Sequence, residues 1–75
     1  MATRMQKPYL APGDTVTVYA DPVTRQKREG TVTLHQFLGK ADGDHSGRLE
    51  WWEVHFHADR PGYYVNRWVG VIDRN

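Results

Sequence analysis

The stretch from Leu49 to His57, LEWWEVHFH, constrains the fold of this chain more than any other. Apolar side chains stand at every second position, at Trp52, Val54 and Phe56. A period of two is typical of a strand with one buried face, because successive strand side chains point to opposite sides. Aromatic and β-branched residues also suit a strand better than a helix. We therefore expect these three side chains to form the centre of the hydrophobic core.

The chain is short and contains no cysteine. Its 75 residues are enough for one domain and include no thiol for a disulfide. A domain of this size buries only about 60% of its unfolded surface, so its stability is marginal. The longest uncharged run, Thr31 to Gly39, is too short for a membrane-spanning helix or a signal-peptide core. We expect a cytoplasmic domain with no membrane partner.

A second strand is predicted near the N-terminus. Pro12 and Gly13 form a turn, and Asp14 to Ala20 then alternates, with Val16 and Val18 inward. Pro22 ends this strand, because proline cannot donate to a ladder. The polar segment Asp21 to Arg28 is predicted to be a long connection.

A third strand is predicted over Thr31 to Leu38, with Val32 and Leu34 buried. Gly30, just before it, marks a bulge or a tight corner. The alternation breaks at Gln36 to Leu38, which indicates another bulge with Phe37 or Leu38 facing inward.

The remaining segments complete an all-β pattern. Gly39 to Arg48 is rich in glycine and aspartate and is predicted to be a loop. Tyr63 to Val69 is predicted to be a fourth strand, followed by a short last strand through Val71 and Ile72. Residues 1–11 show no apolar period and are predicted to form a flexible N-terminal arm, with Tyr9 and Leu10 folding back over the domain. Four or five antiparallel strands avoid open edges by curling into a barrel.

These motifs resemble the Src-homology-3-like small barrels, in particular the Tudor and KOW-like members. The resemblance rests on Gly13-Asp14-x-Val16-x-Val18, Glu29-Gly30-x-Val32-x-Leu34, and Trp52-x-Val54-x-Phe56 followed by a turn and Val65. It covers roughly Pro12 to Asp73. It implies a single, strongly bent antiparallel barrel over residues 12–73.

The charge of the chain argues against a strong nucleic-acid binder. Ten basic residues against nine acidic ones give a formal net charge of +1. The basic residues are uneven, however, and Arg25, Lys27 and Arg28 stand close together. A local basic face for phosphates therefore stays open as an alternative.

One segment matches the spacing of a calcium-binding loop. Asp42, Asp44, Ser46 and Glu53 occupy the first, third, fifth and twelfth positions of an EF-hand loop, and Gly47 stands at its sharp turn. The flanks disagree, because an EF-hand needs helices where this sequence predicts strands. The alternatives are an accidental match in a Gly/Asp loop, a strand-flanked calcium site and a true EF-hand.

His55 and His57 share one strand face, with His35 expected on the neighbouring strand and Asp59 nearby. Such a pair can hold zinc or nickel if a third ligand joins it. The alternative is a polar face exposed to solvent.

The chain has more aromatic residues than one small core can absorb. The candidate binding residues are Tyr19, Trp51, Tyr63, Tyr64, Arg67 and Trp68. An exposed aromatic face can bind a protein or peptide, stack nucleic-acid bases, hold a methylated amine or form a homodimer interface. The alternative is packing within the chain or under the N-terminal arm.

No catalytic signature accompanies these residues. The chain has no cysteine nucleophile and no Gly-x-Ser-x-Gly elbow, and its glycine-rich stretch lacks the helix that a phosphate loop needs. We therefore expect a non-enzymatic binding or adaptor module that recognises a protein or peptide. The alternatives are a nucleic-acid-binding domain and a calcium-responsive domain.

Overall fold

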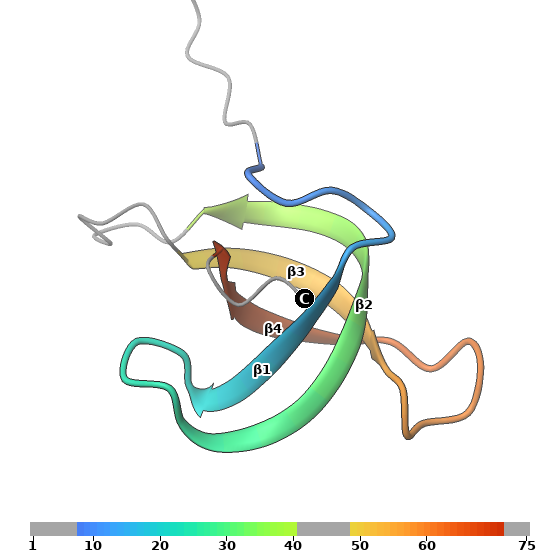
Figure 1. Ribbon diagram of the computed structural model, residues 1–75. Coiled ribbons are helices and arrows are strands. Elements are labelled where there is room, and N and C mark those ends of the chain that lie inside the picture. Colours follow the sequence, from blue (N-terminus) through green and yellow to red (C-terminus); the bar gives the residue numbers. More distant parts are fainter. Residues whose placement is uncertain (1–7, 41–48, 72–75) are drawn as a thin grey trace, which may run out of the picture.

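The computed structural model describes residues 8–40 and 49–71 (Figure 1). These residues form a single antiparallel sheet in the order β1-β2-β3-β4, without an α-helix. The strands are β1 (Thr15–Asp21), β2 (Gln26–Lys40), β3 (Leu49–Phe56) and β4 (Val65–Gly70). The prediction of an all-β domain is confirmed. Within the described ranges, no helix is long and apolar enough to cross a membrane.

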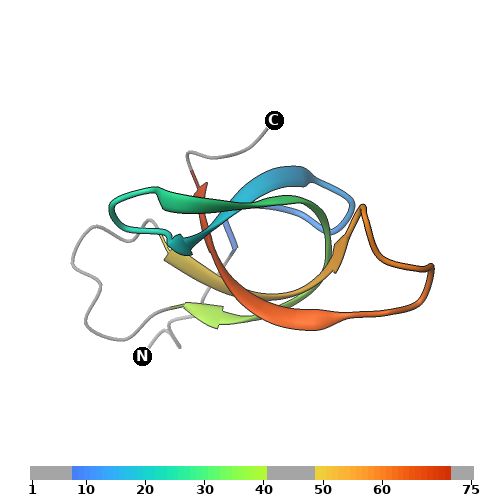
Figure 2. The same cartoon turned by 90° about the horizontal axis from the view of Figure 1, so that it is seen from below.

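β2 is the longest strand and bends the sheet. Its first half pairs with β1 and its second half pairs with β3, with Val32 and Thr33 shared between the two ladders. The bend brings β1 and β4 to face each other across the concave side (Figure 2). These two strands contact each other but are not hydrogen-bonded neighbours, so the sheet is not closed.

The bend at Gly30 is a bulge, as the sequence predicts. Val18 pairs with Gly30 but Tyr19 pairs with Arg28, so Glu29 is an extra residue in β2. Gly30 adopts φ 144°, a region that favours glycine, and a Cβ there would lie 3.6 Å from the Phe56 ring. A Cβ at that distance would make only an ordinary van der Waals contact, so it is the positive φ that favours glycine at this bulge.

The second predicted irregularity is also present in β2. The register shifts between Leu34 and Gln36, and again between Phe37 and Gly39. Phe37 packs against the core and Leu38 is exposed, so the structure selects Phe37 as the inward residue.

The core lies on the concave side of the sheet, as the alternation predicts. Trp52 is fully buried, and its ring meets Phe37 edge to face with centroids 5.4 Å apart. Phe56 is only partly buried and packs at the margin. The buried apolar residues are Leu10, Val16, Val18, Val32, Leu34, Trp52, Val54 and Val69.

The sequence prediction is wrong about the segment Asp21 to Arg28. It is the tip of a tight hairpin, because β1 extends to Asp21 and β2 already begins at Gln26. The Asp21 carboxylate accepts hydrogen bonds from the backbone N–H groups of Val23, at 3.0 Å, and Thr24, at 3.2 Å. Arg25 then takes φ 58°, which reverses the chain.

The hydrogen bonds from Thr24 hold the pKa of the Asp21 carboxyl below its usual value, with a smaller contribution from the backbone of Val23. The turn is thus built on the ionised form of this side chain.

The ends of the sheet differ in detail from the prediction. β4 begins at Val65, two residues later than the predicted Tyr63. Val71 belongs to no strand, and Ile72 lies outside the described residues. Leu10 folds back from the arm, as predicted, and is part of the core cluster.

A buried carboxylate ties the N-terminal residues to the sheet. Glu50 is 0% exposed, and its Oε1 accepts a hydrogen bond of 2.9 Å from the Trp52 indole nitrogen. The backbone N–H groups of Tyr9 and Leu10 also donate to this carboxylate, at 2.5 and 3.4 Å. Lys40, directly opposite on β2, places its Nζ 3.9 Å from Oε2. Glu50 therefore connects the N-terminal segment, β2 and β3.

Candidate functional site

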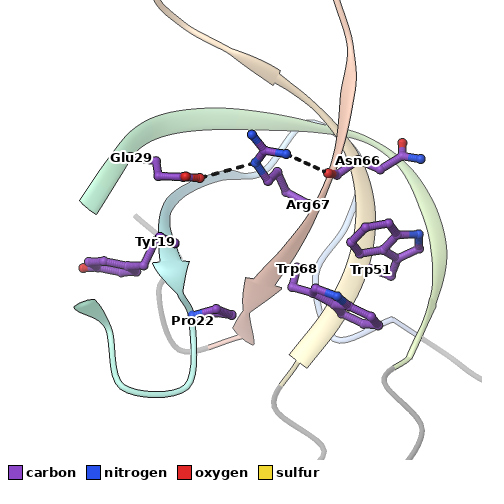
Figure 3. Close-up of a pocket in the computed structure, with 8 residues that line it drawn as sticks. Tyr19, Pro22, Glu29, Trp51, Asn66, Arg67 and Trp68 are labelled. Carbon is purple, nitrogen blue, oxygen red and sulfur yellow. Dashed lines mark hydrogen bonds and ion pairs between the residues drawn. The ribbon is translucent and has the colours of Figure 1, made fainter. Parts of the chain in front are cut away.

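An open groove of about 400 Å³ lies where β1 and β4 face each other (Figure 3). All four strands or their connections contribute to it. Its lining residues are Tyr19, Ala20, Pro22, Glu29, Trp51, Asn66, Arg67 and Trp68. We call this feature the aromatic groove.

One wall of the aromatic groove is a pair of tryptophans. Trp51 on β3 and Trp68 on β4 are directly opposite each other, with ring centroids 4.6 Å apart and planes inclined by 46°. Because Trp52 points into the core, its neighbour Trp51 must point to the outer face. Trp68 remains 37% exposed, so part of its ring is open to solvent beside the groove. Tyr19 from β1 lies on the other side of the groove (Figure 3).

An ion pair lies between these aromatic side chains (Figure 3). Arg67 Nε is 3.3 Å from Glu29 Oε1. Among the described residues this Nε makes no hydrogen bond, so the contact with Glu29 is one between charges rather than a directed hydrogen bond. Arg67 Nη1 donates to the carbonyl oxygen of Asn66 at 3.3 Å, and the guanidinium carbon lies 5.7 Å from the centre of the Phe56 ring.

The bulge in β2 explains how Glu29 reaches this position. As the extra residue between Arg28 and Gly30, it has no direct partner on β1. Its side chain can therefore reach across to β4, the strand that carries Arg67. Of these groove residues, Arg67 was predicted from the sequence, whereas Glu29, Pro22 and Asn66 were not. The bulge signal at Gly30 was readable in the sequence, but the long-range contact that it allows was not.

The structure separates the predicted binding residues into two groups. Tyr19, Trp51, Arg67 and Trp68 line the aromatic groove. Tyr63 and Tyr64 lie elsewhere, in the connection between β3 and β4. Tyr64 stacks on His35 with centroids 4.1 Å apart. Tyr63 lies against Arg60, whose guanidinium carbon is 5.8 Å from the ring centre.

The predicted basic residues of the hairpin do not line the groove. Arg25, Lys27 and Arg28 are exposed on the β1–β2 hairpin, and Arg28 Nη2 donates to Thr31 Oγ1 at 3.3 Å. The basic residue that lines the groove is instead Arg67, on β4.

The histidines on the outer face have separate partners. His35 Nε2 lies 3.5 Å from Glu53 Oε1, and His55 Nε2 lies 3.0 Å from the carbonyl oxygen of Arg60. His57 Nε2 is hydrogen-bonded to the hydroxyl of Thr33 at 2.8 Å. Within residues 8–40 and 49–71, no group of three His, Asp or Glu side chains is arranged to hold a metal ion. The predicted zinc or nickel site has no support here.

The predicted calcium ligands Asp42, Asp44 and Ser46 lie outside the described residues. The fourth, Glu53, is in β3 and contacts His35. The segment after the loop is a strand from Leu49 to Phe56, as predicted, and this excludes the alternative of a true EF-hand, which needs a helix there.

In comparisons with known proteins, the chain matches no family model, and no curated protein or solved structure shows significant similarity to it. The fold and the groove define the class of protein. It is a small all-β domain with an aromatic groove beside the two edge strands of its sheet.

Proposed function

We propose that this chain is a non-enzymatic binding module that recognises an extended protein or peptide segment in the aromatic groove. The observation that carries this proposal is the convergence of Tyr19, Trp51 and Trp68, from three different strands, on one open groove. The strongly bent sheet and its facing edge strands support an assignment to the Src-homology-3-like small barrels.

The exposure of Trp68 supports a recognition role. The core of this domain is made by other side chains, with Trp52 at its centre. Large aromatic side chains kept partly in water, beside a groove, are the usual anchors of protein interfaces. A ligand side chain that covers Trp68 and Tyr19 would remove this apolar surface from water.

The charges in the groove favour a peptide over a nucleic acid. Arg67 is the one basic residue among the groove's lining residues, and Glu29 pairs with it. These two charges of the groove therefore offset each other. A nucleic-acid site needs a surplus of positive charge along the path of the phosphates.

Nucleic acid is the second candidate because of one observation. Arg28 stands directly opposite Tyr19 in the β1–β2 ladder, and Lys27 is exposed beside it. This candidate predicts binding to single strands that weakens steeply with salt. For each phosphate contacted, a tenfold rise in salt concentration should lower the affinity about tenfold. Binding to mixed-sequence oligonucleotides that is absent, or independent of salt, excludes it.

The peptide proposal is tested by selecting binders from a phage-displayed library of random peptides and measuring the affinity of the selected peptides by calorimetry. We expect Trp68→Ala to weaken binding about tenfold or more, because it removes a central aromatic anchor. Tyr64→Ala is the matched control, since Tyr64 is also exposed, at 43%, but lies on a different surface.

Circular dichroism and the midpoint of urea unfolding verify that both variants are folded. A selected peptide that is equally sensitive to both variants, or to Tyr64→Ala alone, contradicts the proposal. So does the failure of any selected peptide to depend on Trp68.

A further inference from the structure

The aromatic groove runs along a strand edge rather than across a sheet face. Asn66, Arg67 and Trp68 are consecutive residues of β4, and all three line the groove. Successive side chains of a strand point to opposite faces, so a groove on one face would touch only alternate residues. Contact with three residues in a row places the groove beside the backbone of β4.

The ladder partners support the same conclusion. Arg67 is opposite Trp52, which points into the core, and Trp68 is opposite Trp51, which points outward. Directly opposite residues in an antiparallel ladder point to the same face. The groove therefore touches side chains of both faces of β4, which meet only at its edge.

In the described residues, β4 is an edge strand of the sheet. In the part of the chain that the structure describes, β4 has one hydrogen-bonded neighbour, β3, and β1 likewise has only β2. An edge strand presents a row of N–H and C=O groups that another strand can pair with. Figure 2 shows β4 facing β1, and Figure 3 shows the residues that line the groove between them.

We propose that the partner binds as an added strand: an extended polypeptide segment pairs with the backbone of β4 at Asn66 to Trp68. Its alternate side chains then enter the groove between Tyr19 and the tryptophan pair. This inference rests on the proposed function and adds to it the binding geometry. A polypeptide is the fitting occupant, because its backbone repeats N–H and C=O groups with the period of β4, whereas a nucleic acid has no such repeat.

The experiment uses the full chain and a peptide selected on it as above. Each backbone amide of the peptide is methylated in turn, which removes one N–H donor at a time. Strand addition predicts a period of two: methylation at alternate positions weakens binding about tenfold, the value of one ordinary hydrogen bond, and methylation between them has little effect. Amide hydrogen exchange of β4, compared with and without the peptide, should show new protection within Asn66 to Trp68.

The outcomes separate this inference from the proposed function. If binding of the peptide depends on Trp68 but methylation has no period-two effect, the proposed function holds and strand addition is overturned. Outward amides of β4 that are already protected in the free protein also overturn it, because the edge is then already paired. Sedimentation of the free protein as a dimer that dissociates with Trp68→Ala assigns the edge to a second copy and contradicts a peptide partner.

Discussion

The carboxylate of Glu50 accepts a hydrogen bond of 2.9 Å from the indole nitrogen of Trp52, and both residues are completely buried. The two residues are neighbours on one face of β3, so this acidic residue lies on the core side of the sheet. Burial of a carboxylate is tolerated only when its oxygens have partners. Trp52, the N–H groups of Tyr9 and Leu10, and Lys40 provide them.

Replacement of Glu50 tests this arrangement. Glu50→Ala leaves the buried indole N–H of Trp52 without its acceptor and removes the carboxylate that Lys40 contacts, so we expect a loss of about 3–5 kcal/mol in the free energy of unfolding. This is a large fraction of the total for a domain of this size. Glu50→Gln, which keeps an acceptor for Trp52, should lose less. Urea denaturation measures both, and equal stability of Glu50→Ala and the unmodified chain would contradict the account.

The adjacent tryptophans of β3 should respond in opposite ways. Trp52→Ala removes the largest core side chain and is expected to cost about 3–5 kcal/mol, enough to unfold most of the protein. Trp51→Ala removes an outer-face ring that packs on Trp68 and should cost only about 1 kcal/mol, while it weakens peptide binding. Thermal unfolding by circular dichroism compares them. Unfolding by Trp51→Ala would show that this ring belongs to the core.

The β1–β2 turn should be sensitive to acid. Because the fold lowers the pKa of Asp21, the ionised side chain stabilises the turn at pH values above the pKa of the unfolded chain. This contribution is lost as the pH falls through the folded-state pKa, which lies below the pKa of the unfolded chain. The amide signals of Val23 and Thr24 should follow this titration in NMR spectra. In Asp21→Ala the titration should vanish, and its persistence there would assign it to another group.

Calcium should not bind tightly. Glu53, the twelfth-position ligand of the predicted loop, lies in a strand and contacts His35. A calorimetric titration with calcium is therefore expected to be flat up to about millimolar concentration, the weak limit for such loops. Heat of binding that saturates at lower concentration, and that Asp42→Ala removes, would restore the calcium hypothesis.

Several elements were predictable because they depend on local patterns. Alternation placed Val16, Val32 and Trp52 on the buried face, and the glycine at position 30 located the bulge. The hairpin at Asp21 was missed because its polar residues show no period, and its form depends on hydrogen bonds to a single carboxylate.

The groove was only partly predictable for a related reason. The excess of aromatic residues indicated an exposed aromatic surface, but the sequence could not show that Trp68 and Tyr64 lie on different surfaces. That separation depends on the pairing of β3 with β4, which places Trp68 opposite Trp51. The contact between Glu29 and Arg67 joins residues far apart in the chain, and no local pattern reports such a contact.

The most direct test of the aromatic groove is a chemical-shift map recorded by NMR as a selected peptide is added to the full chain. The account predicts that the indole N–H signals of Trp51 and Trp68 move, while those of Trp52 and of the backbone at His35 and Tyr64 stay in place. Shifts that gather at His35 and Tyr64, with the Trp51 and Trp68 signals unchanged, would contradict it.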